Sequence, residues 1–380
     1  MRIVGVAWQG YALPFKTEYV TSQGRATAKY GLLVFLRSDD GLIGIGDASP
    51  VGPGDARQVM QLARLLEDLG PQIIGVHFAL ALGFAERDPL TELSALNGLP
   101  ALAFGLETAR FDLVGKAQGK SVAELLGGTP RDLVVNAVIA SDDPAQASEE
   151  AAQAVTDGFG TLKLKVGQPD IQRDVALVSA VRQAAGPGAK LRIDPNQAWT
   201  APQGVAALRR LAQFGLEYAE QPVAAQDLAG MAQVRRETGV PVAADEAMTS
   251  PQDVGRILRA QAADLFILKA ARLGGLAASM EAAQAALLAG KPSVVTSSLE
   301  SGVGLAASAH IASALSSHPF AHGLGTGLLY ASDLLEQPLL PVKGTLHTPL
   351  GPGLGVRVDK AQLRRYAIDI TGGLGLPAGV

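Results

Sequence analysis

The feature that most constrains the fold is a regular alternation of two kinds of segment, which begins at about residue 134. Short apolar runs alternate with Ala- and Leu-rich amphipathic stretches such as 170–185 and 202–214. The runs expected to be strands cover 134–140, 161–166, 190–194, 217–220, 241–245, 264–269, 293–297 and 321–325. Strands that alternate with helices form parallel βαβ units. Eight of them predict a (β/α)8 barrel, although alternation alone also allows a doubly wound open sheet.

The first 130 residues do not show this alternation, and their pattern of apolar and polar residues predicts an α+β capping domain. Strands are expected at 3–8, 31–37 and 42–48, and helices at 55–69, 75–87 and 98–117. Between the first two strands, residues 15–29 are expected to form a mobile loop that could cover a site. The Gly127-Gly128 pair marks a boundary. We therefore expect a capping domain at 1–130, to which 338–380 returns, and a barrel domain at 131–337.

Composition excludes several classes of protein. A hydrophobic content of 48% in 380 residues is ample for a large core, and the net charge of -4 offers no field that attracts nucleic acid or anionic membranes. The chain has no cysteine, which excludes disulfides, thiolate nucleophiles, iron–sulfur clusters and cysteine zinc sites and favours a reducing compartment. No run reaches the roughly 18 uncharged apolar residues of a membrane span. We expect a cytoplasmic protein.

Charged side chains stand at the ends of five successive predicted strands. They are Lys163 and Lys165 on the second strand, Asp194 on the third, Glu220 on the fourth, Asp245 on the fifth and Lys269 on the sixth. In a barrel, the C-terminal ends of the strands converge on the active site. One such aspartate could simply cap the next helix. Three carboxylates about 25 residues apart, one in each βα repeat, favour a shared site instead.

The three carboxylates predict a metal ion. Neighbouring negative charges in an apolar barrel repel one another, and a hard divalent cation would resolve that conflict. Ligands that offer only oxygen favour Mg²⁺ over zinc. We expect Mg²⁺, with Mn²⁺ as an alternative.

The lysines predict acid–base chemistry. Lys163 and Lys165 are two residues apart on a strand, so both side chains share one face. The neighbouring like charge, the metal and partial burial disfavour the ammonium form of Lys165, as a general base requires. Lys269 is expected across the barrel. A solvated lysine pair would suit the apolar run 161–166 poorly. Together, metal and amines predict removal of a proton next to a substrate carboxylate.

The ordered motifs K-x-K, D-x-N, E-Q-P, D-E and K-x-x-x-L-G-G resemble those of the enolase superfamily, in its muconate-lactonizing-enzyme subgroup. The resemblance covers nearly the whole chain and implies a capped barrel. The roles that it implies are Mg²⁺ binding by Asp194, Glu220 and Asp245, acid–base catalysis by Lys165 and Lys269 with Lys163 as auxiliary, and support of these groups by Asn196 and Glu246.

The predicted seventh and eighth strands indicate which members of the superfamily this chain resembles most. The mandelate-racemase subgroup has a catalytic histidine there and dipeptide epimerases an Asp-x-Asp on the eighth strand; this chain has neither. The run Ser297-Ser298-Leu299-Glu300-Ser301 resembles o-succinylbenzoate synthases of menaquinone or phylloquinone biosynthesis. Small hydroxyls before a helix suit a succinyl carboxylate. Ser297, Ser298, Glu300 and Ser301 are therefore predicted to bind substrate.

The sequence thus predicts a Mg²⁺-dependent lyase that removes an α-proton and eliminates water to form o-succinylbenzoate. The alternatives are an N-succinylamino acid racemase, a muconate cycloisomerase or, outside catalysis, a barrel that only binds acids. The expected partners are a small carboxylate substrate and further copies of the same chain, with no nucleic acid and no membrane.

Overall fold

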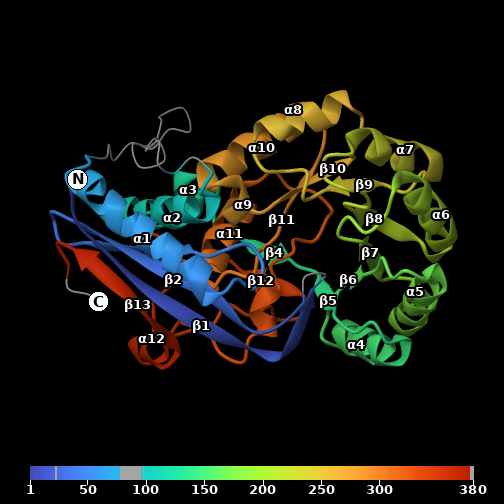
Figure 1. The fold of residues 1–380 in the computed structure, drawn as a ribbon, viewed down its shortest axis with the longest axis horizontal. Coiled ribbons are helices and arrows are strands. Elements are labelled where there is room, and N and C mark those ends of the chain that lie inside the picture. The colour runs from blue at the N-terminus through green and yellow to red at the C-terminus, as the bar shows by residue number, and fades with distance from the viewer. Residues whose placement is uncertain (22–23, 78–95, 97, 377–380) are drawn as a thin grey trace.

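The computed structural model describes residues 1–21, 24–77, 96 and 98–376. An antiparallel sheet with two long helices lies on one side of the molecule, and a curved parallel sheet surrounded by helices lies on the other (Figure 1). None of the helices in these residues is both long and apolar enough to cross a membrane.

The antiparallel sheet joins the two ends of the chain. Its strands are β1 (Ile3–Thr21), β2 (Gly24–Ser38), β3 (Ile43–Ala48) and the C-terminal β13 (Ala367–Leu374), in the order β13-β1-β2-β3. In this register Trp8 lies opposite Val34 on one side and Gly372 on the other. The expected return of the C-terminal tail to the N-terminal part of the chain is visible in this pairing (Figure 1).

The prediction of a mobile loop at residues 15–29 was wrong. Strands β1 and β2 continue through most of it as a long hairpin, with an irregular register between Pro14 and Tyr19. Phe15 is buried and stacks between Tyr19 and Tyr330, so the extended strand has aromatic packing that a mobile loop would lack. The polar content of the segment concealed this packing, which depends on a residue far along the chain.

Helices α1 (Ala56–Ile73) and α2 (Pro100–Gln118) pack against this sheet. The apolar side chains between them and the sheet form a hydrophobic core that is separate from the larger core of the molecule. Strand β3 approaches α2 very closely: a Cβ atom on Gly44 or Gly46 would lie 2.0 Å from the Ala109 carbonyl oxygen or 1.9 Å from that of Gly105. Glycine is therefore required at both positions. The helix expected at 75–87 falls mainly outside the described residues.

The parallel sheet contains seven strands in the described part of the chain, each beside the next in sequence. They are β5 (Ala137–Ile139), β6 (Thr161–Lys165), β7 (Lys190–Asp194), β8 (Leu216–Glu220), β9 (Val242–Ala244), β10 (Leu265–Leu268) and β11 (Ser293–Val295). The intervening helices are α4 (Pro144–Thr156), α5 (Ile171–Ala185), α6 (Ala201–Leu211), α7 (Leu228–Thr238), α8 (Gln252–Arg259), α9 (Ala270–Leu273) and α10 (Leu276–Leu288); α11 (Gly302–Ala314) follows β11. The alternation of strands and helices predicted this barrel-type α/β fold, and the pattern of the first 130 residues predicted the attached cap.

The first and eighth expected strands differ from the prediction. The run 134–140 divides into β4 (Asp132–Val134), which pairs with β12 (Thr345–His347), and β5. The run 321–325 forms only isolated bridges. Its His322 N–H donates to the Val134 carbonyl over 2.8 Å, and its Gly323 N–H to that of Val295 over 2.9 Å. This glycine-rich segment therefore links the two edges of the sheet without being a regular strand.

Shorter elements complete the chain. They are α3 (Val122–Leu125), α12 (Lys360–Tyr366) and the 3-10 turns η2 (Ala212–Phe214) and η3 (Thr326–Leu329).

Candidate active site

The charged residues predicted from the strand ends do converge. Lys163 and Lys165 lie on β6, Asp194 and Glu220 end β7 and β8, and Asp245 and Lys269 directly follow β9 and β10. Lys165 lies opposite Asp194 in the parallel register. Because all these strands run in the same direction, the side chains gather at one end of the sheet.

Ion pairs connect the lysines with the carboxylates. The Lys163 ammonium lies 2.9 Å from Asp194 Oδ2 and 2.6 Å from Glu220 Oε1. The Lys269 ammonium lies 2.6 Å from Asp245 Oδ2, and the Arg272 guanidinium contacts Asp245 Oδ1. All three carboxylates are buried. Charged groups can stay buried here because each has a partner of opposite sign.

Burial and the neighbouring charges shift the pKa values of these groups. Burial opposes the charged form of Lys163, but Asp194 and Glu220 raise its pKa well above the ordinary value. Burial raises the pKa of Glu220 to about 7, although Lys163 opposes this shift. Burial also acts on Asp245, where Arg272 and Lys269 reverse its effect and lower the pKa. The site therefore holds Asp245 firmly ionised and Glu220 much less so.

Lys165 has a different environment from the other two lysines. Its amino group lies 5.6 Å from the centre of the Tyr19 ring, at the far end of the β1–β2 hairpin. Within the described residues, no carboxylate lies within ion-pair distance of it. The hairpin thus covers this lysine with an aromatic face, to which Phe15 is stacked. Tyr19 was not predicted as part of the site, because only the tertiary fold brings it there.

Two side chains predicted to support the site contact each other. Asn196 Nδ2 donates to Glu246 Oε1 over 3.1 Å. Burial raises the pKa of Glu246. Asn196 adopts a left-handed backbone conformation with φ 46°, as does Gln221 with φ 39°. Non-glycine residues in this region are uncommon and gather at functional sites.

Gln221 and Arg272 fix the position of Asp245. Gln221 Oε1 accepts hydrogen bonds from the Asp245 and Ala247 N–H groups, both over 3.0 Å. Arg272 donates to the Asp245 carbonyl over 2.6 Å and to that of Met248 over 3.0 Å. Both residues stand inside motifs noted in the sequence, but sequence reasoning gave them no role. Their contacts join strand ends that are 24 and 27 residues apart, which the sequence alone does not reveal.

The four predicted substrate-binding residues divide into two pairs. Ser297 Oγ donates to Glu300 Oε2 over 2.5 Å, which also accepts from the Ser298 N–H over 2.8 Å. Ser298 Oγ and Glu300 Oε1 are buried and have no hydrogen-bond partner in the described part of the chain. Ser301, in contrast, caps α11 and donates its hydroxyl to Asp47 over 2.7 Å. Ser298 and Glu300 thus retain polar atoms that a ligand could use.

Asp47 connects this loop with the antiparallel sheet. This fully buried carboxylate at the end of β3 accepts from the Ser301 N–H over 2.8 Å, from Tyr11 Oη over 3.0 Å and from Ser49 Oγ over 2.5 Å. Sequence reasoning missed it, since a lone aspartate in a cap strand belongs to no barrel motif. The network ties the cap to the loop after the seventh strand.

Comparison with known proteins identifies the family. Residues 2–127 match the family model of the mandelate racemase / muconate lactonizing enzyme N-terminal domain, and residues 146–362 match that of the enolase C-terminal domain-like family. The chain belongs to the enolase superfamily. Within it, the chain belongs to the muconate-lactonizing-enzyme subgroup, so the resemblance noted in the sequence is confirmed.

Relatives within the superfamily have several activities. Chloromuconate cycloisomerase of Cupriavidus pinatubonensis is 33% identical over 93% of this chain and 96% of its own. The o-succinylbenzoate synthase of Thermobifida fusca is 43% identical over 63% of this chain and 72% of its own. The structure of N-succinyl Arg/Lys racemase from Bacillus cereus is 26% identical and superposes with a TM-score of 0.88, covering 98% of this chain and 100% of that one. This chain is therefore an enzyme. Identities of 33–43% do not determine which of these reactions it catalyses.

Enzymes of the superfamily generally use a divalent metal, and the residues here fit one. Glu220 Oε2 is buried without a hydrogen-bond partner among the described residues. It stands between Asp194 and Asp245 on neighbouring strands, and all three offer hard oxygen ligands. Among the described residues, no group of three acidic or histidine side chains is arranged closely enough to hold a metal ion in this conformation. The Lys163 ammonium lies between Asp194 and Glu220 and pairs with both of them.

Proposed function

We propose that the enzyme is a Mg²⁺-dependent lyase that forms o-succinylbenzoate by removing a proton α to a carboxylate and eliminating water. The observation that carries this proposal is the unequal pairing of the three lysines. Lys163 and Lys269 each bind a carboxylate, whereas Lys165 has none within ion-pair distance in the described part of the chain. Lys165 is therefore the amine positioned to act as the base.

In this proposal Asp194, Glu220 and Asp245 hold the metal, with Mn²⁺ as an alternative to Mg²⁺. A bound divalent cation supplies positive charge that stabilises the charge developing on a substrate carboxylate as its α-proton leaves. Asn196 and Glu246 support the ligands. The site lies where the proposed capping domain (1–130 with 338–380) meets the proposed barrel domain (131–337).

The elimination requires only one acid–base group. The Lys165 amine takes the α-proton and becomes an ammonium ion. It then donates that proton to the departing hydroxyl on the same face, the C–O bond breaks, a C=C bond forms and water leaves. Lys269, held by Asp245, remains cationic and stabilises the negative charge on the substrate. Lys163 positions Asp194 and Glu220.

The seventh-strand loop supports the choice of a succinyl-bearing substrate. Ser298 Oγ is buried and lacks a partner within the described residues, and it lies just before the N-terminus of α11. A hydroxyl near helix N–H groups suits a carboxylate. The 43% identity with an o-succinylbenzoate synthase points the same way. The product would enter menaquinone or phylloquinone biosynthesis.

A second candidate, an N-succinylamino acid racemase, is favoured by one observation. Lys165 ends β6 and Lys269 follows β10, with β7, β8 and β9 between them, so the two amines approach from different sides of the mouth. Racemisation needs a proton donor and a proton acceptor on opposite faces of the α-carbon. Muconate cycloisomerisation remains a further alternative, and the reading as a non-catalytic binding module is excluded by the superfamily.

The decisive test runs both substrates under the same Mg²⁺ conditions. We expect efficient formation of o-succinylbenzoate, followed by its aromatic absorbance, and slower racemisation of N-succinylamino acids, followed by circular dichroism. Racemisation with a far larger kcat/KM would contradict the synthase assignment and favour the second candidate. Loss of both activities on chelation, with recovery on adding Mg²⁺, is expected in either case.

A further inference from the structure

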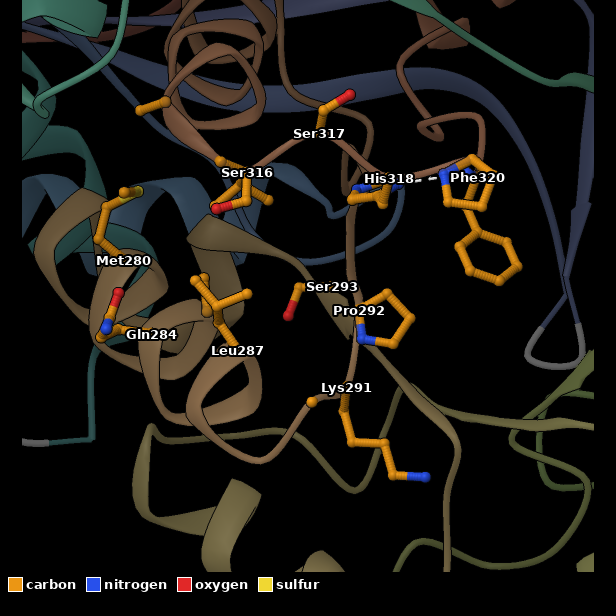
Figure 2. A pocket seen from close by; sticks show the side chains of 15 residues that line it. Met280, Gln284, Leu287, Lys291, Pro292, Ser293, Ser316, Ser317, His318 and Phe320 are labelled. Atoms are coloured by element: carbon orange, nitrogen blue, oxygen red, sulfur yellow. Dashed lines mark hydrogen bonds between the residues drawn. The ribbon is translucent and has the colours of Figure 1, made fainter.

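A cavity lies at the end of the parallel sheet opposite the lysines. It has a volume of about 390 Å³ and lies between α10, the start of β11 and the segment that follows α11 (Figure 2). Ser293 begins β11 and lines the cavity, whereas Ser297 and Ser298 follow the other end of the same strand. The cavity is therefore separate from the candidate active site.

Two polar side chains in its wall have unused hydrogen-bonding atoms. Ser293 is only 5% exposed, and its hydroxyl has no partner among the described residues. Figure 2 shows this hydroxyl directed into the space between Leu287 and Pro292. The Phe320 N–H donates to His318 Nδ1 over 3.2 Å, so the neutral ring carries its proton on Nε2. That nitrogen is also buried without a partner in the described part of the chain.

The surroundings of these atoms favour a negatively charged ligand group. Among the described residues that line the cavity none is a carboxylate, and the single charged one is Lys291, whose amino group lies 3.6 Å from Asp264. Behind the wall, Arg131 Nε and Arg192 Nη2 are buried without partners among the residues described. Burial lowers the pKa of His318, and both arginines add to this effect. A weak hydrogen-bonding interaction with the Ser293 backbone opposes it, but its geometry is too poor to make Ser293 a hydrogen-bond partner of Nε2. Arg192 is itself paired with Glu217 over 2.5 Å, so the positive potential at His318 comes mainly from Arg131.

The rest of the wall is apolar. Met280 and Leu287 from α10, Pro292 before β11 and Leu315 after α11 contribute hydrocarbon surface on several sides. A concave, largely apolar space of this size with a few converging polar groups is typical of a small-molecule site. A ligand with an apolar body and one hydrogen-bond acceptor group at its end would fit this wall, because the Ser293 hydroxyl and the His318 Nε2–H are available as donors.

We propose that this cavity binds a small apolar carboxylate, with the carboxylate accepting hydrogen bonds from Ser293 Oγ and His318 Nε2. It is a second ligand site, separate from catalysis and independent of the reaction proposed above. The Ser293 hydroxyl and the His318 N–H gain the partners that they lack, and the alkyl or aryl body of the ligand covers Met280 and Leu287.

The test measures binding of 4-phenylbutyrate by calorimetry to the full-length protein. It uses the Lys165→Ala variant with chelator, which removes from the active site the metal and the lysine that has no carboxylate partner in the described residues. We expect saturable binding at millimolar concentration, weakened about tenfold by Ser293→Ala and abolished by Leu287→Trp, which narrows the cavity. Leu288→Trp is the matched control, because Leu288 is 80% exposed and does not line the cavity. It should bind as the parent does.

Three outcomes would overturn the proposal. They are the absence of saturable binding, binding that Leu287→Trp leaves unchanged, and equal binding of the neutral amide of the probe, which would remove the carboxylate from the argument. A concentration-dependent association of the protein that Leu287→Trp abolishes, without binding of the probe, would show instead that the cavity receives a second copy of the chain. Thermal unfolding confirms that each variant is folded before its binding is interpreted.

Discussion

The two halves of the candidate active site differ in the balance between their buried carboxylates and the cations that pair with them. On β6 to β8, one ammonium, that of Lys163, is shared between two carboxylates, and Glu220 Oε2 has no hydrogen-bond partner in the described part of the chain. On β9 and β10, one carboxylate, Asp245, has two cations, Lys269 and Arg272. The first half is short of positive charge and the second half is not. A divalent cation is therefore needed most beside Glu220.

The largest effect is expected for Glu220→Gln, which removes a carboxylate from the half where one ammonium is shared between two carboxylates. Activity should fall by about a thousandfold or more, because a substrate carboxylate loses electrostatic stabilisation. For wild-type protein, Mg²⁺ at about 100 times its Kd should stabilise the fold by about 2.7 kcal/mol. Thermal unfolding with and without Mg²⁺ measures this increment, which the variant should lack.

Glu237→Gln serves as the control for this variant, since Glu237 forms an exposed pair with Arg209 far from the cluster. Its activity and its response to Mg²⁺ should be those of the wild type. A normal Mg²⁺ increment in Glu220→Gln would show that the metal does not bind beside this residue.

A smaller loss is expected for Arg272→Met, which leaves Asp245 with Lys269 alone. Groups that orient metal ligands typically contribute about 10- to 100-fold in metal affinity or activity. We expect the apparent Mg²⁺ affinity and kcat to fall within that range, as measured by Mg²⁺ titration of activity. Arg209→Met removes an exposed cation and should leave both quantities unchanged. If Arg272→Met cost as much as Glu220→Gln, the contrast between the two halves would be wrong.

A still smaller effect is expected where the cap meets the barrel. Asp47→Asn keeps the size of the side chain but weakens its charge-assisted hydrogen bonds to Ser301 and Tyr11. The loop that carries Ser298 would lose part of its support, so KM should rise about tenfold with a smaller change in kcat. Ser301→Ala removes one of the same bonds and should shift KM in the same direction. An unchanged KM in both variants would remove the loop from substrate binding.

The smallest effect concerns stability rather than activity. Burial lowers the pKa of His310 to about 4. Its Nδ1 accepts from the Ala123 N–H over 3.2 Å, so the folded state holds the ring neutral. Stability from this residue is complete above the ordinary histidine pKa of about 6.5 and is lost as the pH falls towards 4. Denaturant unfolding should show a decline of up to about 1.4 kcal/mol per pH unit in this window.

His310→Gln should flatten this decline. His347, exposed on β12, is the matched control, and His347→Gln should retain the wild-type slope. A slope that His310→Gln leaves unchanged would assign the acid sensitivity to another group.

Much of this architecture follows from periodicity in the sequence, and the exceptions have physical causes. The strand ends with Asp194, Glu220 and Lys269 were predicted because one βα repeat places like positions at one end of a sheet. The contact of Tyr19 with Lys165 and that of Asp47 with Ser301 join segments far apart in the chain, and no local pattern encodes them. The segment at His322 failed as a strand because its glycines favour bridges over a regular ladder.

The most direct test of the account concerns Lys165, the lysine without a carboxylate partner in the described residues. We would measure, by NMR in D₂O with Mg²⁺, exchange of the α-proton of an N-succinylamino acid by wild-type protein and by Lys165→Ala, together with formation of o-succinylbenzoate. The account predicts that the variant loses both activities by at least about a hundredfold while keeping the Mg²⁺-dependent rise in thermal stability. Exchange and product formation near wild-type rates in Lys165→Ala would contradict it.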